Sequence, residues 1–215
     1  MEIVCYVVTA FAAYLLGSIP TGFLVAQTRG IDIRTVGSGN IGATNTLRVL
    51  GKPAGIFVLV MDALKGWLAV VPLAFLIATL FHQPHSGTGH ETAQIIAGLC
   101  AILGHNYTCW LQFKGGKGIA TSAGVLLALV PWALLIIFVL FLVTLLLTRY
   151  VSLASIAAAT ALPFASWLTG ESPAKIIITG AMGMLAIYKH RENIARLLKG
   201  TERRLGAQPA TEASK

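Results

Sequence analysis

Three polar segments of this sequence carry residue types that could bind phosphate groups. The first, residues 37–48, reads GSGNIGATNTLR and includes a helix predicted to begin near Ala43. Glycines let backbone N–H groups approach an anion closely, and the N-terminus of the following helix adds partial positive charge. A flexible membrane loop would also explain the glycines, but a linker does not need Arg48 one turn further along. The candidate phosphate-binding residues of this segment are Gly37, Ser38, Gly39, Asn40, Thr44, Asn45 and Arg48.

The second segment, residues 113–121, reads FKGGKGIAT and places a lysine among three glycines at the start of a predicted helix. The GxxxxGK[ST] spacing is absent and no strand precedes the segment, so Walker-type nucleotide binding is not favoured. Successive backbone amides together with the lysine ammonium group predict anion binding instead. The alternative is a turn whose lysines extend toward lipid phosphate. The candidate residues are Gly115, Gly116, Lys117, Gly118 and Thr121.

The third segment, residues 189–204, reads KHRENIARLLKGTERR. Taken alone, its apolar residues at helical spacing among basic ones are typical of an amphipathic helix that lies on anionic lipid. His190 and Asn193 are three residues apart and share one face of that helix, so they could point back into the protein. Because two other segments offer phosphate-type donors, we expect His190 and Asn193 to belong to the same site.

Asp62 and Lys65 lie inside an apolar run and are three residues apart, close enough to pair on a helix. Ionisable residues at such depth are costly and usually face the interior of a helix bundle. Catalysis and a structural ion pair both stay open, and support of the helix beneath the first segment is favoured. His105 is expected, with Asn106, at the start of the second polar loop, where it orients the loop or contacts substrate.

The elements that position these residues must lie in a membrane. Of the 215 residues, 56% are hydrophobic and 11% are charged, and the mean hydropathy is +0.77. An ordinary soluble protein carries about 25% charged residues, so this composition cannot cover a water-facing surface. The net charge of +8 does not indicate nucleic-acid binding, because the basic residues lie between apolar runs. Cys5, Cys100 and Cys109 show no CxxC or metal-ligand spacing, so no disulfide framework, metal site or cofactor is expected.

The apolar runs predict an all-α membrane bundle of about seven transmembrane helices, one of them short, with five as the alternative. A single helix over 119–147 would reach about 43 Å, more than the ~30 Å hydrocarbon core needs, so Pro131 is expected to divide it. Residues 1–206 are expected to form one domain, followed by a disordered tail at 207–215. The predicted spans cover 3–27, 53–80, a run that begins at 92, the two parts of 119–147, 151–168 and 174–188.

Basic residues concentrate in alternate loops. The stretches 28–52 and 104–118, the turn after residue 147 and the tail from 189 onward hold 14 of the 16 Lys and Arg residues. The positive-inside rule therefore places these loops and the C-terminus in the cytoplasm, and the N-terminus outside. All three polar segments would then face the cytoplasm.

Several common catalytic signatures are absent from the sequence. No His is followed by Asp in the HxxxxD spacing of acyl-CoA-dependent acyltransferases, no GxSxG elbow offers a serine nucleophile, and no DxxD cluster suggests a Mg²⁺ site. Few candidate bases remain. A reaction whose substrate supplies both the base and a good leaving group fits these residues best.

Together the three segments resemble the acyl-phosphate-dependent glycerol-3-phosphate acyltransferases of bacteria, the PlsY family. The matching stretches are GSIPTGFLVAQTRGIDIRTVGSGNIGATNTLRVLGK with Asp62 and Lys65 downstream, then GHNYTCWLQFKGGKGIAT, then HRENIARLLKGTE. The resemblance implies a seven-helix bundle whose motifs gather on the cytoplasmic side of the membrane.

The resemblance also implies roles for individual residues. It places Ser38 and Arg48 in the first motif as phosphate-holding residues and makes Lys117 the lysine of the second. His190 and Asn193 correspond to the residue pair of the third motif. The catalytic set that the resemblance implies is therefore Ser38, Arg48, Lys117, His190 and Asn193. The sequence departs from the family pattern at Thr108 and Cys109, where Pro and an aliphatic residue are expected, which bears on the local shape of the second loop.

The implied reaction transfers a fatty acyl group from acyl phosphate to the 1-hydroxyl of glycerol 3-phosphate, the first acylation of phospholipid synthesis. The products are 1-acylglycerol 3-phosphate and phosphate, with substrate phosphate as the base, no covalent intermediate and no cofactor. The implied setting is a bacterial inner membrane, with the lipid bilayer and a soluble enzyme that makes acyl phosphate as partners. A transporter for organic phosphates is the main alternative, although its contacts should lie near the midplane in repeated halves. A scaffolding membrane protein would not need glycine- and lysine-lined anion sites.

Overall fold

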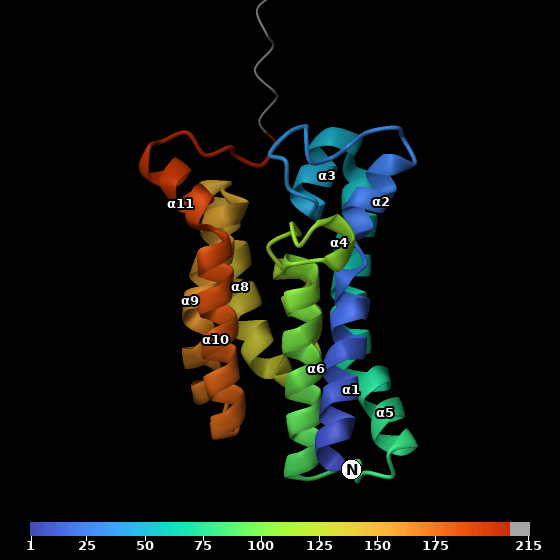
Figure 1. The fold of residues 1–215 in the computed structure, drawn as a ribbon. Helices are drawn as coiled ribbons and strands as arrows, with labels where there is room; N and C mark the ends of the chain where they lie inside the picture. The colour runs from blue at the N-terminus through green and yellow to red at the C-terminus, as the bar shows by residue number, and fades with distance from the viewer. Residues whose placement is uncertain (207–215) are drawn as a thin grey trace, which may run out of the picture.

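The fold is a bundle of helices that run side by side, with the three polar segments at one end (Figure 1). It is seen in a computed structural model that describes residues 1–206. The tail predicted at 207–215 lies outside the described residues. Every regular element within residues 1–206 is helical, in agreement with the predicted all-α class. In Figure 1, one side of the bundle is formed by α1 (Glu2–Ser18), α4 (Lys52–Leu68), α5 (Ala74–Leu80) and α6 (Thr88–Asn106). The other side is formed by α8 (Pro131–Thr148), α9 (Val151–Leu168) and α10 (Pro173–Lys189).

The apolar run at the N-terminus is divided into two helices. We predicted one helix over 3–27, but α1 (Glu2–Ser18) and α2 (Thr21–Gln27) are separate. Pro20 has no backbone N–H and cannot continue the hydrogen-bond ladder of α1. The Ile19 carbonyl at the break accepts a hydrogen bond from Lys65 Nζ at 2.8 Å. α3 (Ala43–Leu50) then begins at the predicted residue.

The second apolar run is helical throughout but not uniform. α4 (Lys52–Leu68) passes into a five-residue π-helical segment, η1 (Ala69–Leu73), which is followed by α5 (Ala74–Leu80). The π-helical segment contains Pro72, whose ring and missing N–H cannot be accommodated in a regular α-helical turn. The buried residues Asp62 and Lys65 lie on α4, which precedes this irregular segment in the chain.

The third apolar helix extends beyond the predicted run in both directions. α6 (Thr88–Asn106) ends with His105 and Asn106, so these two residues belong to the helix. We had expected them at the start of the following loop. A 3₁₀ turn, η2 (Cys109–Leu111), lies within the loop. Thr108, where we had expected Pro, donates its hydroxyl to the Ser18 carbonyl oxygen at 2.6 Å. Thr108 therefore ties this loop to the end of α1.

The long apolar run at 119–147 divides where predicted. α7 (Ile119–Leu129) and α8 (Pro131–Thr148) meet at Val130, immediately before Pro131. The chain continues through α9 (Val151–Leu168) and α10 (Pro173–Lys189). α11 (Arg191–Leu198) forms the helical part of the third polar segment.

Four helical segments are long and apolar enough to cross a membrane. They are Glu2–Gln27, Lys52–Leu80, Pro131–Thr148 and Val151–Leu168, and the shorter apolar helix Ile119–Leu129 accompanies them. The protein is therefore a multi-pass membrane protein. The count of seven transmembrane helices stays a prediction. Large apolar side chains on α8, such as Leu146 with 79% of its surface exposed, point away from the bundle, as a lipid-facing helix requires.

Close packing of backbones joins α1 to α6. A Cβ on Gly17 would collide with the backbone of Ala101, and a Cβ on Gly104 would collide with the carbonyl oxygen of Tyr14. Helices in lipid gain little from apolar burial against one another, so small residues that allow close contact favour their association. This tight pair fixes the end of α6, from which the glycine-rich second loop departs.

Candidate functional site

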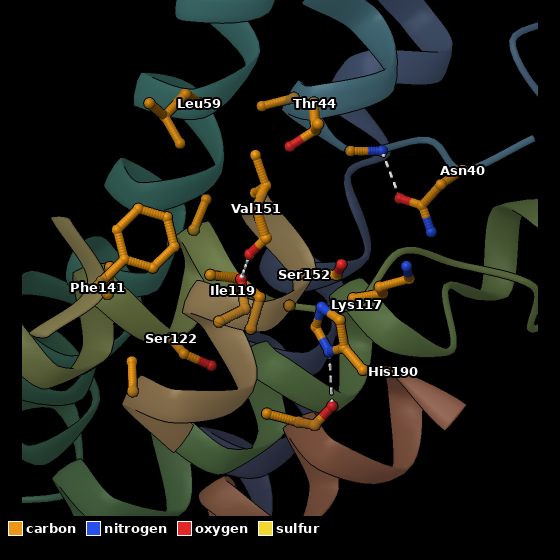
Figure 2. Close-up of a pocket in the computed structure, with 18 of the residues that line it drawn as sticks. Asn40, Thr44, Leu59, Lys117, Ile119, Ser122, Phe141, Val151, Ser152 and His190 are labelled. Atoms are coloured by element: carbon orange, nitrogen blue, oxygen red, sulfur yellow. Dashed lines mark hydrogen bonds between the residues drawn. The ribbon is translucent and has the colours of Figure 1, made fainter. Parts of the chain in front are cut away.

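A cavity of about 640 Å³ opens at the end of the bundle where the three polar segments meet. Apolar side chains from α4, α7, α8, α9 and α10 line its inner part, among them the buried Leu126, Leu162 and Met182. Leu59 and Phe141 border the cavity from opposite helices (Figure 2). The polar end of the cavity is lined by Ser38, Asn40, Thr44, Arg48, Lys117, Ser152, His190, Asn193, Arg196 and Glu202. The cavity thus suits a molecule with an anionic head and an apolar tail.

The side chain of Asn45 holds the first loop in shape. Its Oδ1 accepts a hydrogen bond from the Ser38 backbone N–H at 2.8 Å, and its amide nitrogen donates to the carbonyls of Ile33 and Val36. These bonds use the amide, so the structure indicates support of the loop and not the phosphate contact we had expected. Gly37 is required beside it, because its φ is +63° and a Cβ would collide with Asn45 Oδ1.

The other first-segment candidates are placed at the cavity, except one. Asn40 and Thr44 both line its polar end (Figure 2), and the Asn40 side chain accepts a hydrogen bond from the Gly42 N–H at 2.9 Å. Ser38 and Arg48 also line the cavity. Gly39 lies outside the cavity lining.

The glycines of the second loop do not form the anion cradle that we predicted. The N–H groups of Gly115 and Gly116 donate to the carbonyls of Asn106 and His105, at 3.2 and 3.0 Å, so neither N–H is free for an anion. Neither glycine lines the cavity. Both are needed for close packing, because a Cβ on either would collide with His105.

The amides available for an anion lie two residues further along, at the start of α7. The first N–H groups of a helix have no partner within it and attract anions. Gly118, Ile119 and Ala120 line the cavity at this helix start, and Gly118 adopts a φ of +77°. Thr121 is fully buried and lies outside the cavity lining, so the structure does not place it at the predicted site.

Lys117 is the cation at the centre of the polar end. Its Nζ donates a hydrogen bond to Asn193 Oδ1. The pKa of Lys117 is lowered to about 8, chiefly by burial and also by the nearby charges of Arg196 and Arg48, against the opposing effect of Glu202. The ammonium group is therefore held ready for an anion that would relieve this repulsion.

His190 is a neutral imidazole with one nitrogen already used. Its Nδ1 lies 2.8 Å from the Ala186 carbonyl oxygen, and a carbonyl can only accept, so Nδ1 carries the proton (Figure 2). Burial lowers the pKa of His190 to about 4, and the charge of Lys117 acts in the same direction. Nε2 is left as an acceptor, and Figure 2 shows the ring beside Lys117 and Ser152.

Glu202 is a site residue that sequence reasoning missed. Its Oε1 accepts hydrogen bonds from Asn193 Nδ2 at 2.7 Å and from Ser152 Oγ at 2.8 Å. Its Oε2 accepts from Arg196 Nε at 2.7 Å. Burial would raise the pKa of Glu202, but these hydrogen bonds hold it below its usual value. The only available signal was a carboxylate nine residues after Asn193, in a basic stretch that also contains Glu192.

Residues 199–206 follow α11 across the end of the bundle (Figure 1), and Glu202, Arg203 and Leu205 among them line the cavity. The Leu205 N–H donates to the Arg149 carbonyl at 2.7 Å, and the Arg149 guanidinium donates to the Leu205 carbonyl at 3.1 Å. Arg48 donates to the Arg203 carbonyl at 3.4 Å. We call residues 199–206 the strap, because these contacts fasten the segment across helices from both halves of the chain.

The structure therefore brings most of the predicted residues together from three separate segments. His105 reaches the cavity from the end of α6. The predicted residues that line the cavity are Gly37, Ser38, Asn40, Thr44, Asn45, Arg48, His105, Lys117, Gly118, His190 and Asn193.

Comparison with known proteins gives one consistent family. The model of the family described as "Glycerol-3-phosphate acyltransferase" matches residues 7–200. A glycerol-3-phosphate acyltransferase of Geotalea daltonii is 48% identical over 196 residues, covering 91% of this chain and 95% of the relative. A crystal structure of PlsY, an integral membrane glycerol 3-phosphate acyltransferase, in its glycerol 3-phosphate form has a TM-score of 0.82 and 41% identity, covering 94% of this chain and 96% of its own. The lysophosphatidic acid form of PlsY has a TM-score of 0.80 and 40% identity, with coverage of 94% and 95%.

Replacement of Gly116 by alanine tests whether this glycine serves packing. We expect Gly116→Ala to destabilise the protein by about 1–3 kcal/mol, because the new Cβ collides with the buried His105 ring. Gly180→Ala is the matched control, since its Cβ would meet only Pro163, at 3.9 Å, and alanine favours a helix. Thermal unfolding in detergent measures both variants. Equal midpoints for Gly116→Ala and the unmodified protein would contradict the packing role.

Proposed function

The chain belongs to the glycerol-3-phosphate acyltransferase family, and from this membership we propose that its acyl donor is acyl phosphate. The reaction transfers the fatty acyl group to the 1-hydroxyl of glycerol 3-phosphate, giving 1-acylglycerol 3-phosphate and inorganic phosphate. The observation that carries the proposal is one cavity with a cationic polar end and an apolar interior. An acyl phosphate has the same division between phosphate head and hydrocarbon tail.

Charge at the polar end supports the binding of two phosphate groups side by side. Arg48, Lys117 and Arg196 line this end, whereas Glu202 is its only carboxylate apart from the deeper Asp62 among the described lining residues. Arginine and lysine hold phosphate through charge-assisted hydrogen bonds. The start of α7 adds backbone amides. We assign the acyl phosphate head to these amides and glycerol 3-phosphate to Arg48 and Lys117, with help from Asn193.

The proposed chemistry needs no nucleophilic side chain. Acyl phosphate is a mixed anhydride, so its phosphate is already a good leaving group. The 1-hydroxyl oxygen of glycerol 3-phosphate attacks the acyl carbonyl carbon, and the bond from that carbon to the phosphate oxygen breaks. Alignment of two bound reactants can contribute about 7–11 kcal/mol to the barrier reduction. A single direct transfer then requires no covalent enzyme intermediate.

The hydroxyl proton passes to a phosphate oxygen of the substrate. A phosphate monoester titrates near pH ~6 and can accept a proton at neutral pH. The pKa of His190, at about 4, makes this imidazole the weaker base of the two. His190 Nε2 instead accepts a hydrogen bond from a glycerol hydroxyl and orients it. In this scheme Ser38 contributes its hydroxyl to phosphate binding.

We also propose that the polar end faces the cytoplasm of a bacterial cell from its inner membrane. The excess of Lys and Arg in the loops at this end supports that orientation. Glycerol 3-phosphate then enters from the cytoplasm, where a soluble enzyme supplies acyl phosphate.

Vesicle assays with two donors test the donor and the orientation together. We expect acyl phosphate, but not acyl-CoA, to support turnover when glycerol 3-phosphate is added to sealed inverted vesicles. Sealed right-side-out vesicles should turn over only after permeabilisation. Lys117→Ala and Arg48→Ala serve as inactive controls that insert normally. Turnover with acyl-CoA alone would refute the proposed donor, and turnover in sealed right-side-out vesicles would refute the orientation.

The variant His190→Ala separates binding from proton transfer. If substrate phosphate is the base, the main effect is a higher KM for glycerol 3-phosphate, with the pH profile of kcat unchanged. Removal of a true general base costs about 10²–10⁴-fold in rate. Steady-state kinetics of the purified variant measure both quantities. A loss of that size in kcat, together with a changed pH profile, would assign the base to His190.

The titration of Lys117 predicts an alkaline limit for substrate capture. Its pKa is lowered to about 8, so the free enzyme loses the ammonium charge as pH rises through that value. We expect kcat/KM for glycerol 3-phosphate, which reports the free enzyme, to fall above pH ~8. In Lys117→Arg the guanidinium stays charged, so the fall should move to higher pH. If the alkaline fall in kcat/KM occurs at the same pH in Lys117→Arg, a group other than Lys117 causes the fall.

A further inference from the structure

A buried ion pair lies directly beneath the polar end of the cavity. Asp62 and Lys65 are one turn apart on α4, and their side chains are 2% and 5% exposed. Asp62 Oδ1 lies 2.8 Å from Lys65 Nζ. Burial of two charges costs more free energy than their attraction commonly returns, so apolar residues would serve stability equally well. The contacts around the pair indicate a different use.

On one side the ion pair fixes the support of the first loop. Thr21 Oγ1 donates to Asp62 Oδ1 at 3.0 Å, and Lys65 Nζ donates to the Ile19 carbonyl. Both contacts fall at the break before α2. Gly22 of α2 packs directly against the first loop, because a Cβ there would collide with the Ile41 carbonyl oxygen. The start of α2, and with it the loop that carries Ser38 and leads into α3, is thereby tied to the ion pair.

On the other side the same carboxylate faces the support of the second loop. His105 Nδ1 lies 3.7 Å from Asp62 Oδ1, too long for a hydrogen bond, and this buried nitrogen has no other hydrogen-bond partner among the described residues. The other ring nitrogen, Nε2, lies against Gly116, where a Cβ would collide with it. The His105 carbonyl accepts the Gly116 N–H at 3.0 Å. The backbone next to Lys117 therefore rests on His105, and the ring is too enclosed to serve as a base.

We propose that Asp62 is a positioning residue for acyl transfer. Its carboxylate sets the first loop, through Thr21 and Lys65, and the second loop, through His105, at the separation that two bound substrates require. Displacement of a reacting group by about 1 Å can cost about 10²-fold in rate. The inference goes beyond the proposed function, because it concerns the placement of cations on two loops and holds for any acyl donor.

The double variant Asp62→Asn/Lys65→Met tests the proposal without leaving an unpaired buried charge. We expect it to insert and to unfold at nearly the same temperature as the unmodified enzyme, with kcat lowered about 10²-fold and KM for glycerol 3-phosphate changed much less. The matched control is Glu171→Gln/Lys175→Met. That change removes an ion pair of 3.0 Å that does not line the cavity, and kcat should stay within about twofold of the unmodified value.

His105→Gln supplies a second variant with its own measurement. We expect a lower kcat at an unchanged unfolding temperature. The triple variant Asp62→Asn/Lys65→Met/His105→Gln combines the double variant with His105→Gln. Because His105 acts downstream of Asp62, its kcat should be no lower than that of the slower of these two parent variants. A folded double variant or His105→Gln with kcat within twofold of the unmodified enzyme would overturn the proposal, as would multiplicative effects in the triple variant. If the double variant does not fold, His105→Gln alone decides. Each kcat is expressed as a ratio to that of the unmodified enzyme, measured with whichever acyl donor the enzyme uses. The expected ratios therefore do not depend on the assignment of acyl phosphate as the donor.

Discussion

Mutual repulsion among cations at one end of the cavity is the constraint on which the site depends. Arg48, Lys117 and Arg196 share this partly buried space, and Glu202 compensates for only part of their charge. The lowered pKa of Lys117 reflects that imbalance as well as burial. Each cation donates to a partner in the third segment, Arg48 to the Arg203 carbonyl, Lys117 to Asn193 and Arg196 to Glu202, so the fold resists their repulsion. In the proposed function, a phosphate group bound among these cations would relieve their repulsion.

The bundle makes that arrangement possible by ending its helices at the same level. α2, α3, α7 and α11 all begin at or near the polar end, where helix starts and loops supply hydrogen-bond donors that spanning helices lack. The apolar interior continues directly from this end between α7, α8, α9 and α10. One cavity can therefore hold a charged group at the water interface and a hydrocarbon chain in the bilayer region. Its catalytic role needs no deep polar channel.

Sequence alone identified the helical class, the division before Pro131 and the three segments that meet at the cavity. It failed where a residue's role depends on partners distant in the chain. Gly115 and Gly116 have the composition of an anion loop, but their amides bond to the end of α6, a contact that no local pattern reveals. Asn45 likewise faces backbone carbonyls that only the folded loop presents. Glu202 was missed because a carboxylate in a basic segment has no spacing signature, and its significance comes from Ser152 on another helix.

The strap also has a bearing on biosynthesis. Residues 199–206 follow every membrane helix that the structure describes, yet Glu202 and Leu205 form part of the cavity wall and are bonded to the region around α9. A ribosome-bound chain whose helices have already entered the bilayer would thus still lack one wall of its binding chamber. Membrane integration and competence for turnover are consequently separate events, and the second must wait for the segment translated after the last helix has been inserted.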